Sequence, residues 1–120
     1  MYTFNHCCHY VSNMERSMKF YEDNFGMEKL NEINNERFQM VFIGFKSAPD
    51  FFLELIKDKN KSGVYDLGDK SFHFAFFTDD FDECYSGHNK SNIVVSEELE
   101  KYKYFVEDPD GYLIEVLKKR

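Results

Sequence analysis

The spacing of apolar and polar residues in the first half of the chain predicts one helix among four strands. Between residues 14 and 25, methionine and aromatic residues recur every three or four positions, as on the buried face of a helix. Ser12 and Glu15 have the spacing of a capping box at its start, and Gly26 is placed to end it. Strand-type runs occupy residues 2–10, 27–34, 37–45 and 51–57, with a turn predicted at Ser47–Asp50. The predicted order is β-α-β-β-β.

The second half repeats this order of elements. A strand is predicted over residues 71–78, and Asp80 with Glu83 indicates a second helix that continues to about Ser86. Further strands are predicted at 92–96, 101–107 and 112–117. The repeat predicts an α+β fold of two βαβββ modules. We expect a single domain over residues 1–120, with module one at about 1–58, a connector at about 59–70 and module two at about 71–120.

The segment Tyr104–Val116, YFVEDPDGYLIEV, predicts a hairpin with a tight turn at Asp108–Gly111. Proline presets the backbone angle φ at the second turn position, and glycine closes the turn where a side chain would collide. The returning strand carries Glu115 between two apolar neighbours. A carboxylate in such a strand requires a compensating partner.

Four polar residues interrupt apolar strands at corresponding places in the two modules: His6 and Glu54 in the first and last strands of module one, and His73 and Glu115 in those of module two. Singly, such a histidine is more often a hydrogen-bonded core residue, and such a glutamate usually faces water. Repeated in both modules, two imidazoles and two carboxylates on rigid strands form an N₂O₂ ligand set that suits a divalent metal.

Strand alternation separates the candidate histidines. Side chains on a strand point alternately to opposite faces, so His6 and His9 cannot share one site. His6 lies five residues before Val11, at the entry to the first helix, and His73 five residues before Thr78, at the entry to the second, which favours His6 as the ligand. We expect His9 to face outward or toward an interface, and His88 to be exposed. No cysteine lies in a motif that would activate a thiolate.

Composition narrows the possible partners. The formal net charge of −7 argues against nucleic acid, whose phosphates require a basic surface. No apolar run is long enough to span a membrane, and the N-terminus lacks a secretory signal pattern. Three cysteines, two of them adjacent, do not form a disulfide framework. We therefore expect a cytoplasmic protein with neither a nucleic-acid nor a membrane partner.

Motifs similar to those of one known family recur almost from end to end. They are His6 followed by VSNMERSMKFY at 11–21, then FLEL at 52–55, YDLG at 65–68, FHFAF at 72–76 and FVEDPDGYLIEV at 105–116. Together they resemble the glyoxalase I (lactoylglutathione lyase) group of the vicinal oxygen chelate superfamily. The fold of that family is two βαβββ modules, in agreement with the order predicted above. Its sites are typically built between two subunits, so the resemblance implies a homodimer.

The resemblance also implies a chemistry. The family's metal positions fall on His6, Glu54, His73 and Glu115, implying one divalent ion of nickel, cobalt or zinc per site. The implied activity is isomerisation of the hemithioacetal of methylglyoxal and a low-molecular-weight thiol to a lactoyl thioester, through a metal-bound enediolate. The implied catalytic base is Glu115, with Glu54 serving the other face of the substrate.

Other activities of the superfamily remain open. They include epimerisation of a CoA thioester, thiol transfer of the fosfomycin-inactivating type and non-catalytic binding of a small molecule. Thiol transferases and dioxygenases of the superfamily typically have a metal site with two histidines and one carboxylate. The full set of two histidines and two glutamates therefore favours an isomerase.

Two positions depart from the pattern of the glutathione-dependent members. Those enzymes generally carry an arginine four residues after the first metal histidine and an asparagine four residues after the first metal glutamate. Here the two positions hold Tyr10 and Asp58, and Asp58 would repel a carboxylate of glutathione. Arg37, Lys101 and Lys103 are candidates to compensate. The identity of the thiol therefore stays open.

Overall fold

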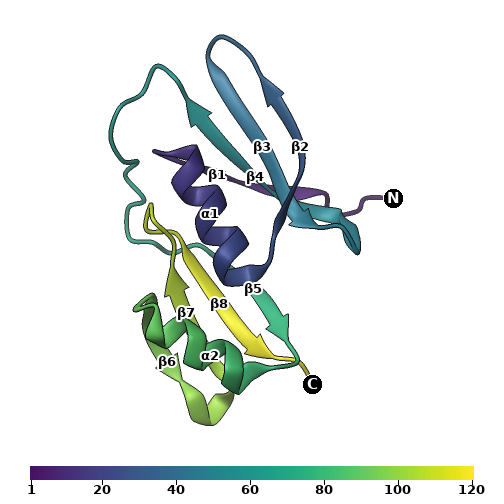
Figure 1. Ribbon diagram of the computed structural model, residues 1–120, viewed down its shortest axis with the longest axis vertical. Helices are drawn as coiled ribbons and strands as arrows, with labels where there is room; N and C mark the ends of the chain where they lie inside the picture. The colour runs from purple at the N-terminus through teal and green to yellow at the C-terminus, as the bar shows by residue number, and fades with distance from the viewer. The chain divides into compact units, whose positions relative to one another are not determined.

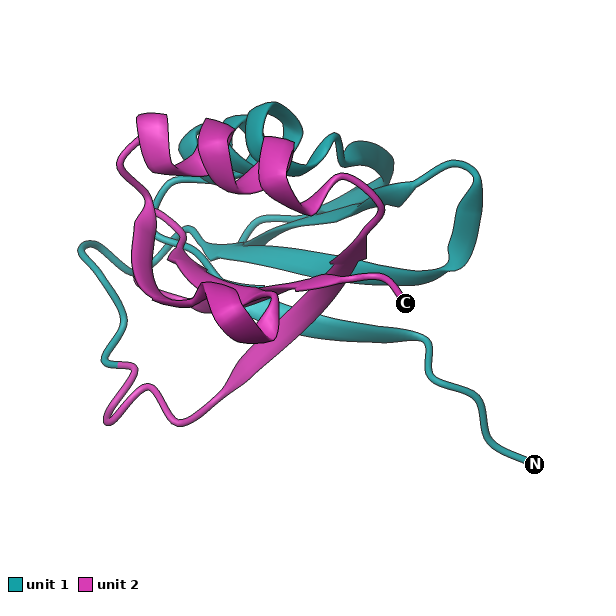
Figure 2. Cartoon of the chain, turned by 90° about the horizontal axis from the view of Figure 1, so that it is seen from below, with its two compact units in different colours: residues 1–66 teal, residues 67–120 magenta.

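Eight strands, two α-helices and one short 3-10 helix make up the chain in a computed structural model that describes residues 1–120 (Figure 1). Unit 1, Met1–Asp66, contains β1 (His6–Tyr10), α1 (Met14–Phe25), β2 (Glu28–Asn34), β3 (Phe38–Phe45) and β4 (Ala48–Asp58). Unit 2, Leu67–Arg120, contains β5 (His73–Thr78), α2 (Phe81–Lys90), β6 (Val94–Glu98), η1 (Leu99–Lys101), β7 (Lys103–Glu107) and β8 (Leu113–Lys118) (Figure 2). The prediction of an α+β fold with two βαβββ modules is confirmed.

Unit 1 is a mixed sheet in the order β1-β4-β3-β2, with β1 parallel to β4. Helix α1 covers one face, where the Tyr21 hydroxyl lies 3.4 Å from Nδ1 of His9 on β1. His9 is level with Leu55, meaning that the two are direct neighbours across adjacent strands, and Leu55 is level with Val41 in the same way. These buried side chains form the core under the helix. The alternate residues form the opposite surface, here termed open face 1; it carries His6, Cys8 and Tyr10 of β1, Phe52, Glu54, Ile56 and Asp58 of β4, and Phe38, Met40 and Phe42 of β3.

Unit 2 repeats this arrangement with the order β5-β8-β7-β6, in which β5 is parallel to β8. Helix α2 covers one face, where His88 Nδ1 lies 2.8 Å from the hydroxyl of Tyr104 on β7. Tyr104 is level with Val116, and both are buried. The opposite surface, open face 2, carries His73, Ala75 and Phe77 of β5, Leu113, Glu115 and Leu117 of β8, and Lys103, Phe105 and Glu107 of β7.

Two histidines lie in the cores of their units, so the surface positions predicted for them are wrong. His9 is 1% exposed because strand alternation turns it toward α1, where it meets Tyr21. His88 is 7% exposed because α2 continues to Lys90, which places the imidazole against Tyr104. In both cases a tyrosine hydroxyl gives the buried ring a polar contact.

Several element ends also differ from the prediction. The residue that caps α1 is Asn13, whose Oδ1 accepts a hydrogen bond from the backbone N–H of Arg16 at 3.0 Å; Ser12 Oγ instead accepts from the Arg16 guanidinium. Strand β4 begins at Ala48, which confines the turn before it to Lys46 and Ser47. Neither α1, with 12 residues, nor α2, with 10, is long enough to cross a membrane, and no other helix is longer.

The buried hydroxyl of Tyr104 makes the stability of unit 2 depend on alkaline pH. Burial, with a smaller contribution from Cys84, raises the pKa of Tyr104 above its usual value. An unfolded tyrosine loses its proton near pH ~10, whereas the folded one keeps it. The free energy of unfolding that this group contributes is therefore complete below pH ~10 and is lost as the pH rises above that value.

Replacing Tyr104 with phenylalanine tests this dependence. Urea unfolding at pH ~7 should give a free energy of unfolding lower by about 1 kcal/mol, since the hydrogen bond to His88 is lost. Between pH ~10 and ~12 the decline in stability should be shallower than in the wild-type protein. Tyr102→Phe, which removes the hydroxyl of a half-exposed tyrosine, is the matched control and should keep the wild-type pH dependence. An equally steep decline in Tyr104→Phe would contradict the assignment.

Candidate metal centre

The candidate ligands of unit 1 lie together on open face 1. His6 is on the edge strand β1 and Glu54 on its parallel neighbour β4, and His6 Nε2 lies 3.9 Å from Glu54 Oε1. The side chain of Glu54 is 15% exposed and that of His6 is 40% exposed. The ring of His6 stacks on Phe52, with 5.2 Å between centroids and 8° between planes, which fixes the orientation of the imidazole.

The candidate ligands of unit 2 have the same arrangement on open face 2. His73 Nε2 lies 3.4 Å from Glu115 Oε1. His6 is level with Phe52 and His73 with Leu113, so in each unit the glutamate lies two residues beyond the partner of the histidine. The modules therefore repeat both the residue types and their register.

The neighbours of the two glutamates correspond as well, with one exception. Phe42 on β3 is level with Glu54, and Phe105 on β7 is level with Glu115. On the other side, Cys8 is level with Glu54, whereas Ala75 is level with Glu115. Sequence analysis did not identify Cys8 as a site residue, although its position two residues after His6 puts it on the same strand face.

The thiol of Cys8 is a hydrogen-bond donor to Glu54 rather than a nucleophile. Burial raises the pKa of Cys8 to about 11, with smaller contributions from the charge of Glu54, from Cys7 and from the hydrogen bond to Glu54. Burial also raises the pKa of Cys7. Both thiols therefore remain protonated at neutral pH, as expected of cysteines without an activating motif.

Asn5 sets the tautomer of His6. Its side-chain carbonyl Oδ1 lies 2.6 Å from His6 Nδ1. Because a carbonyl oxygen can only accept a hydrogen bond, Nδ1 carries the proton, and the lone pair of the neutral ring is on Nε2, beside Glu54. A polar contact of this kind on the outer nitrogen is typical of histidines that bind metals.

The tight turn predicted at Asp108–Gly111, before β8, is present. Asp108 Oδ1 accepts hydrogen bonds from the backbone N–H groups of Asp110 and Tyr112, each at 2.9 Å. Gly111 has a φ of 93°, which favours glycine. Asp108 is therefore confirmed as a turn former, and the turn leads directly into the strand that carries Glu115.

Each unit thus provides one imidazole and one carboxylate with facing Nε2 and Oε1 atoms. Neither unit by itself brings together three or more His, Cys, Asp or Glu side chains that could hold a metal. The donor types and the His6 tautomer nevertheless fit a borderline divalent ion such as zinc, cobalt or nickel. Two such pairs would complete an N₂O₂ ligand set.

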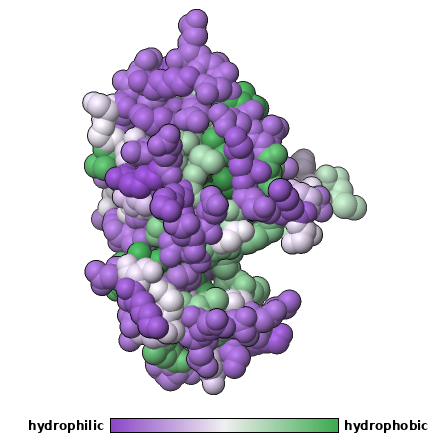
Figure 3. All heavy atoms as spheres, viewed as in Figure 1, coloured by the Kyte–Doolittle hydropathy of each residue, from purple (hydrophilic) through white to green (hydrophobic).

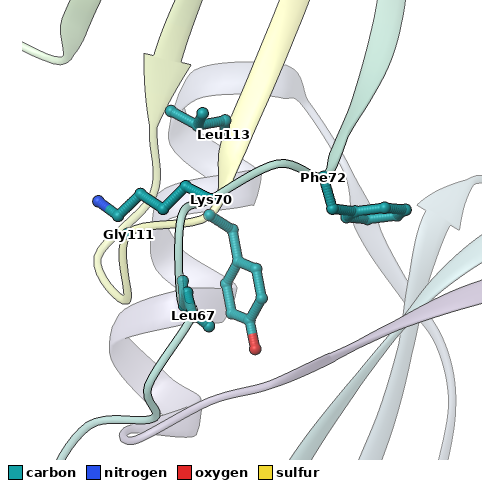
Figure 4. A pocket seen from close by; sticks show the side chains of 6 residues that line it. Leu67, Lys70, Phe72, Gly111 and Leu113 are labelled. Carbon is teal, nitrogen blue, oxygen red and sulfur yellow. The ribbon is translucent and has the colours of Figure 1, made fainter.

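Unit 2 contains a small cavity of about 100 Å³ (Figure 4). It lies where β5 and β8 begin and is lined by Leu67, Lys70, Phe72, Gly111, Tyr112 and Leu113. Lys70 at its rim pairs with Glu107, with 3.2 Å between Nζ and Oε2. Its wall includes Leu113, which is level with His73 on open face 2, and is mostly apolar.

Three basic residues were candidates to replace the glutathione-binding groups missing at Tyr10 and Asp58, and they lie in different units. Lys101 and Lys103 both pair with Glu98, at 2.8 and 3.4 Å, and lie in unit 2. Arg37 lies in unit 1, where a guanidinium nitrogen is 3.4 Å from Asp58 Oδ2. Only Arg37 is therefore beside a position that departs from the glutathione-binding pattern.

Comparisons with known proteins agree on one superfamily. The family model described as "Glyoxalase/Bleomycin resistance protein/Dioxygenase superfamily" matches residues 3–116. Lactoylglutathione lyase of Neisseria meningitidis serogroup A is 31% identical over 118 residues, which cover 92% of this chain and 86% of that protein. The lactoylglutathione lyase of Salmonella typhimurium is 29% identical over 120 residues, covering 92% and 87%.

Solved structures give the same result. The trypanothione-dependent glyoxalase I of Leishmania major superposes with a TM-score of 0.88 at 27% identity and covers 98% of this chain and 87% of that one. Glyoxalase I from Zea mays superposes with a TM-score of 0.84 at 26% identity, over 97% of this chain but only 44% of the longer maize chain.

Proposed function

Because the chain belongs to the glyoxalase/bleomycin resistance/dioxygenase superfamily, we propose that it is a metal-dependent glyoxalase I-type lyase. It would isomerise the hemithioacetal of methylglyoxal and a low-molecular-weight thiol to a lactoyl thioester. Relatives that are lactoylglutathione lyases, 31% identical over most of the chain, support this activity. The observation that carries the proposal is the pair of histidine and glutamate, which recurs in both units at the same register.

We propose His6, Glu54, His73 and Glu115 as the residues that hold one divalent ion of nickel, cobalt or zinc. The chemistry that such an ion supplies is Lewis acidity, which makes the substrate C–H beside the sulfur easier to deprotonate. The carboxylates of Glu54 and Glu115 are each 15% exposed, so a substrate above the open faces can reach them.

Glu115 is the proposed catalytic base. It removes the proton from the carbon that bears sulfur and returns a proton to the neighbouring carbonyl carbon. The reaction gains and loses no atoms, since the aldehyde-derived carbon becomes the thioester carbonyl and the ketone becomes the alcohol. Phe105 and Ala75 are level with Glu115 on the two neighbouring strands. Glu54 serves the other face of the substrate.

Each unit supplies only half of the ligand set, which supports a homodimer as the working form. In the proposed dimer, His6 and Glu54 of one subunit meet His73 and Glu115 of the other. The three cysteines are free thiols, in keeping with the reducing cytoplasm as the proposed compartment.

Metal analysis followed by an activity assay tests the proposal. Purified protein should contain a divalent transition metal, and chelation should abolish formation of the thioester from methylglyoxal and a thiol, followed by ultraviolet absorbance. Nickel, cobalt or zinc should restore it. Protein that binds no metal would refute the enzymatic proposal. Metal-loaded protein that is inactive with every thiol tested would favour epimerisation or thiol transfer.

A further inference from the structure

We propose that Cys8 makes the two carboxylates of the site unequal: its thiol restrains Glu54, so that most of the proton transfer passes through Glu115. This inference rests on the proposed function, because it concerns the two glutamates of the same site. Cys8 is a positioning residue, since it affects the reaction only through Glu54. Its role gives a physical reason why one of two glutamates with matching surroundings is the principal base.

The repeat of the two units makes the two carboxylates nearly equivalent. Each glutamate side chain is 15% exposed, faces the Nε2 atom of a histidine and is level with a phenylalanine on the neighbouring antiparallel strand. Two features differ between the units. Cys8 occupies in unit 1 the place that Ala75 occupies in unit 2, and the distance between Nε2 and Oε1 is 3.9 Å in unit 1 against 3.4 Å in unit 2.

Cys8 lies directly beside Glu54 on the same face of the sheet. Strand β1 is parallel to β4 and Cys8 is level with Glu54, so their backbones are separated only by the spacing of neighbouring strands, about 4.8 Å. Strand alternation turns both side chains to open face 1, where the thiol donates a hydrogen bond to the carboxylate. Ala75 has only a methyl group, so β5 offers no such donor at the level of Glu115.

Glu54 is unlike the solvated carboxylates that are common on this acidic chain. The formal net charge is −7, and hydrophilic side chains predominate on the surface of both units in the view of Figure 3. The side chain of Glu54 is instead 15% exposed and has Phe42 level with it on β3. A carboxylate that has lost most of its water is stabilised by a hydrogen-bond donor. Cys8 is the donor that β1 supplies.

The hydrogen bond makes Glu54 the slower of two bases. A general base must turn a lone pair of one oxygen toward the substrate proton. The bond from Cys8 occupies one lone pair of Glu54 and fixes the orientation of the carboxylate. Giving up a typical hydrogen bond of this kind slows a step about fivefold, the equivalent of ~1 kcal/mol. Proton transfer through Glu54 carries this penalty and transfer through Glu115 does not.

The test measures the activity that remains in Glu115→Gln. There proton transfer must pass through Glu54, so a second substitution, Cys8→Ala, should raise the residual kcat about fivefold, whereas Cys8→Ser, which keeps a donor, should not. The substrate is the methylglyoxal adduct of glutathione or of N-acetylcysteine, whichever the wild type isomerises faster, with metal content matched. Loss of a residue that only supports the fold would lower kcat instead. If Cys8→Ala does not raise the residual kcat although the wild type is active, the role of Cys8 is refuted and the proposed function stands.

The chain provides two matched controls. Cys7 is level with the buried Leu53, so its thiol points to the helix side of β1, and Cys7→Ala should not raise the residual kcat of Glu115→Gln. Ala75 is exposed, so a larger side chain has room there. In Glu54→Gln, where the proton passes through Glu115, Ala75→Cys should lower kcat about fivefold. An unchanged kcat in that variant would also contradict the inference.

Infrared spectroscopy tests the restraint independently of activity. Subtracting the spectrum of Cys8→Ala from that of the wild type isolates the S–H stretching band of Cys8 from those of Cys7 and Cys84. Because a neutral amide accepts more weakly than a carboxylate, the band should move to higher frequency in Glu54→Gln and stay in place in Glu115→Gln. A band that ignores Glu54→Gln refutes the role of Cys8. If the band responds but the metal-loaded protein isomerises neither adduct, the proposed function fails and the restraint on Glu54 stands.

Discussion

Glu115→Gln is expected to lower kcat for isomerisation by roughly 10²–10⁴-fold, the contribution of a positioned general base. Glutamine keeps the shape of the side chain and one oxygen atom that can bind the metal, but it cannot accept the substrate proton. Since Phe105 and Ala75 lie on either side, the amide should occupy the same place without rearrangement. Initial rates of thioester formation, at saturating substrate, give the change in kcat.

Glu107→Gln is the matched control for this variant. Glu107 is another carboxylate on open face 2, at the end of β7 directly before the turn, and its partner is Lys70 rather than a histidine. Its replacement should leave kcat close to the wild-type value. Metal content must be measured in both proteins. If Glu115→Gln retains the metal and full activity, the base is another residue.

Mixing two inactive variants should restore activity. His6→Ala and His73→Ala each remove one imidazole from every site and should be inactive alone. After subunit exchange, about half of the dimers are mixed, and each of these has one site with all four ligands and one site with neither histidine. Activity should therefore reach roughly a quarter of the wild-type value per subunit.

A second mixture provides the control for this experiment. His6→Ala and Glu54→Ala both change unit 1, so every site in their mixed dimers lacks one ligand. That mixture should remain inactive. If the first mixture also stays inactive after confirmed exchange, the two halves of each site come from the same chain, and the proposed dimeric site is wrong.

The order of elements followed from apolar spacing, and the correspondence of His6 and Glu54 with His73 and Glu115 followed from the repeat of residue types. Strand alternation correctly separated His6 from His9. The same rule cannot say which of two faces a helix covers, and for that reason His9 was placed on the wrong side. Both faces of a strand can be apolar in sequence, so only the packing of α1 decides between them.

Local propensity also failed where tertiary packing outweighed it. Gly87 suggested an early end to α2, yet burial of His88 against Tyr104 extends that helix to Lys90. The pairing of Arg37 with Asp58 joins residues 21 positions apart, and no periodicity in the sequence indicates it. Contacts of this kind depend on which strands are neighbours and on their register.

The period of two in β8 links folding to chemistry. Ile114 and Val116 are buried on the helix side, and Glu115 lies between them on open face 2. A slip of β8 by one residue would expose both aliphatic side chains and turn the carboxylate into the core. Packing of the interior therefore also fixes the position of the proposed catalytic base. A misregistered chain would not survive as a stable but inactive protein, because the same error would unfold it.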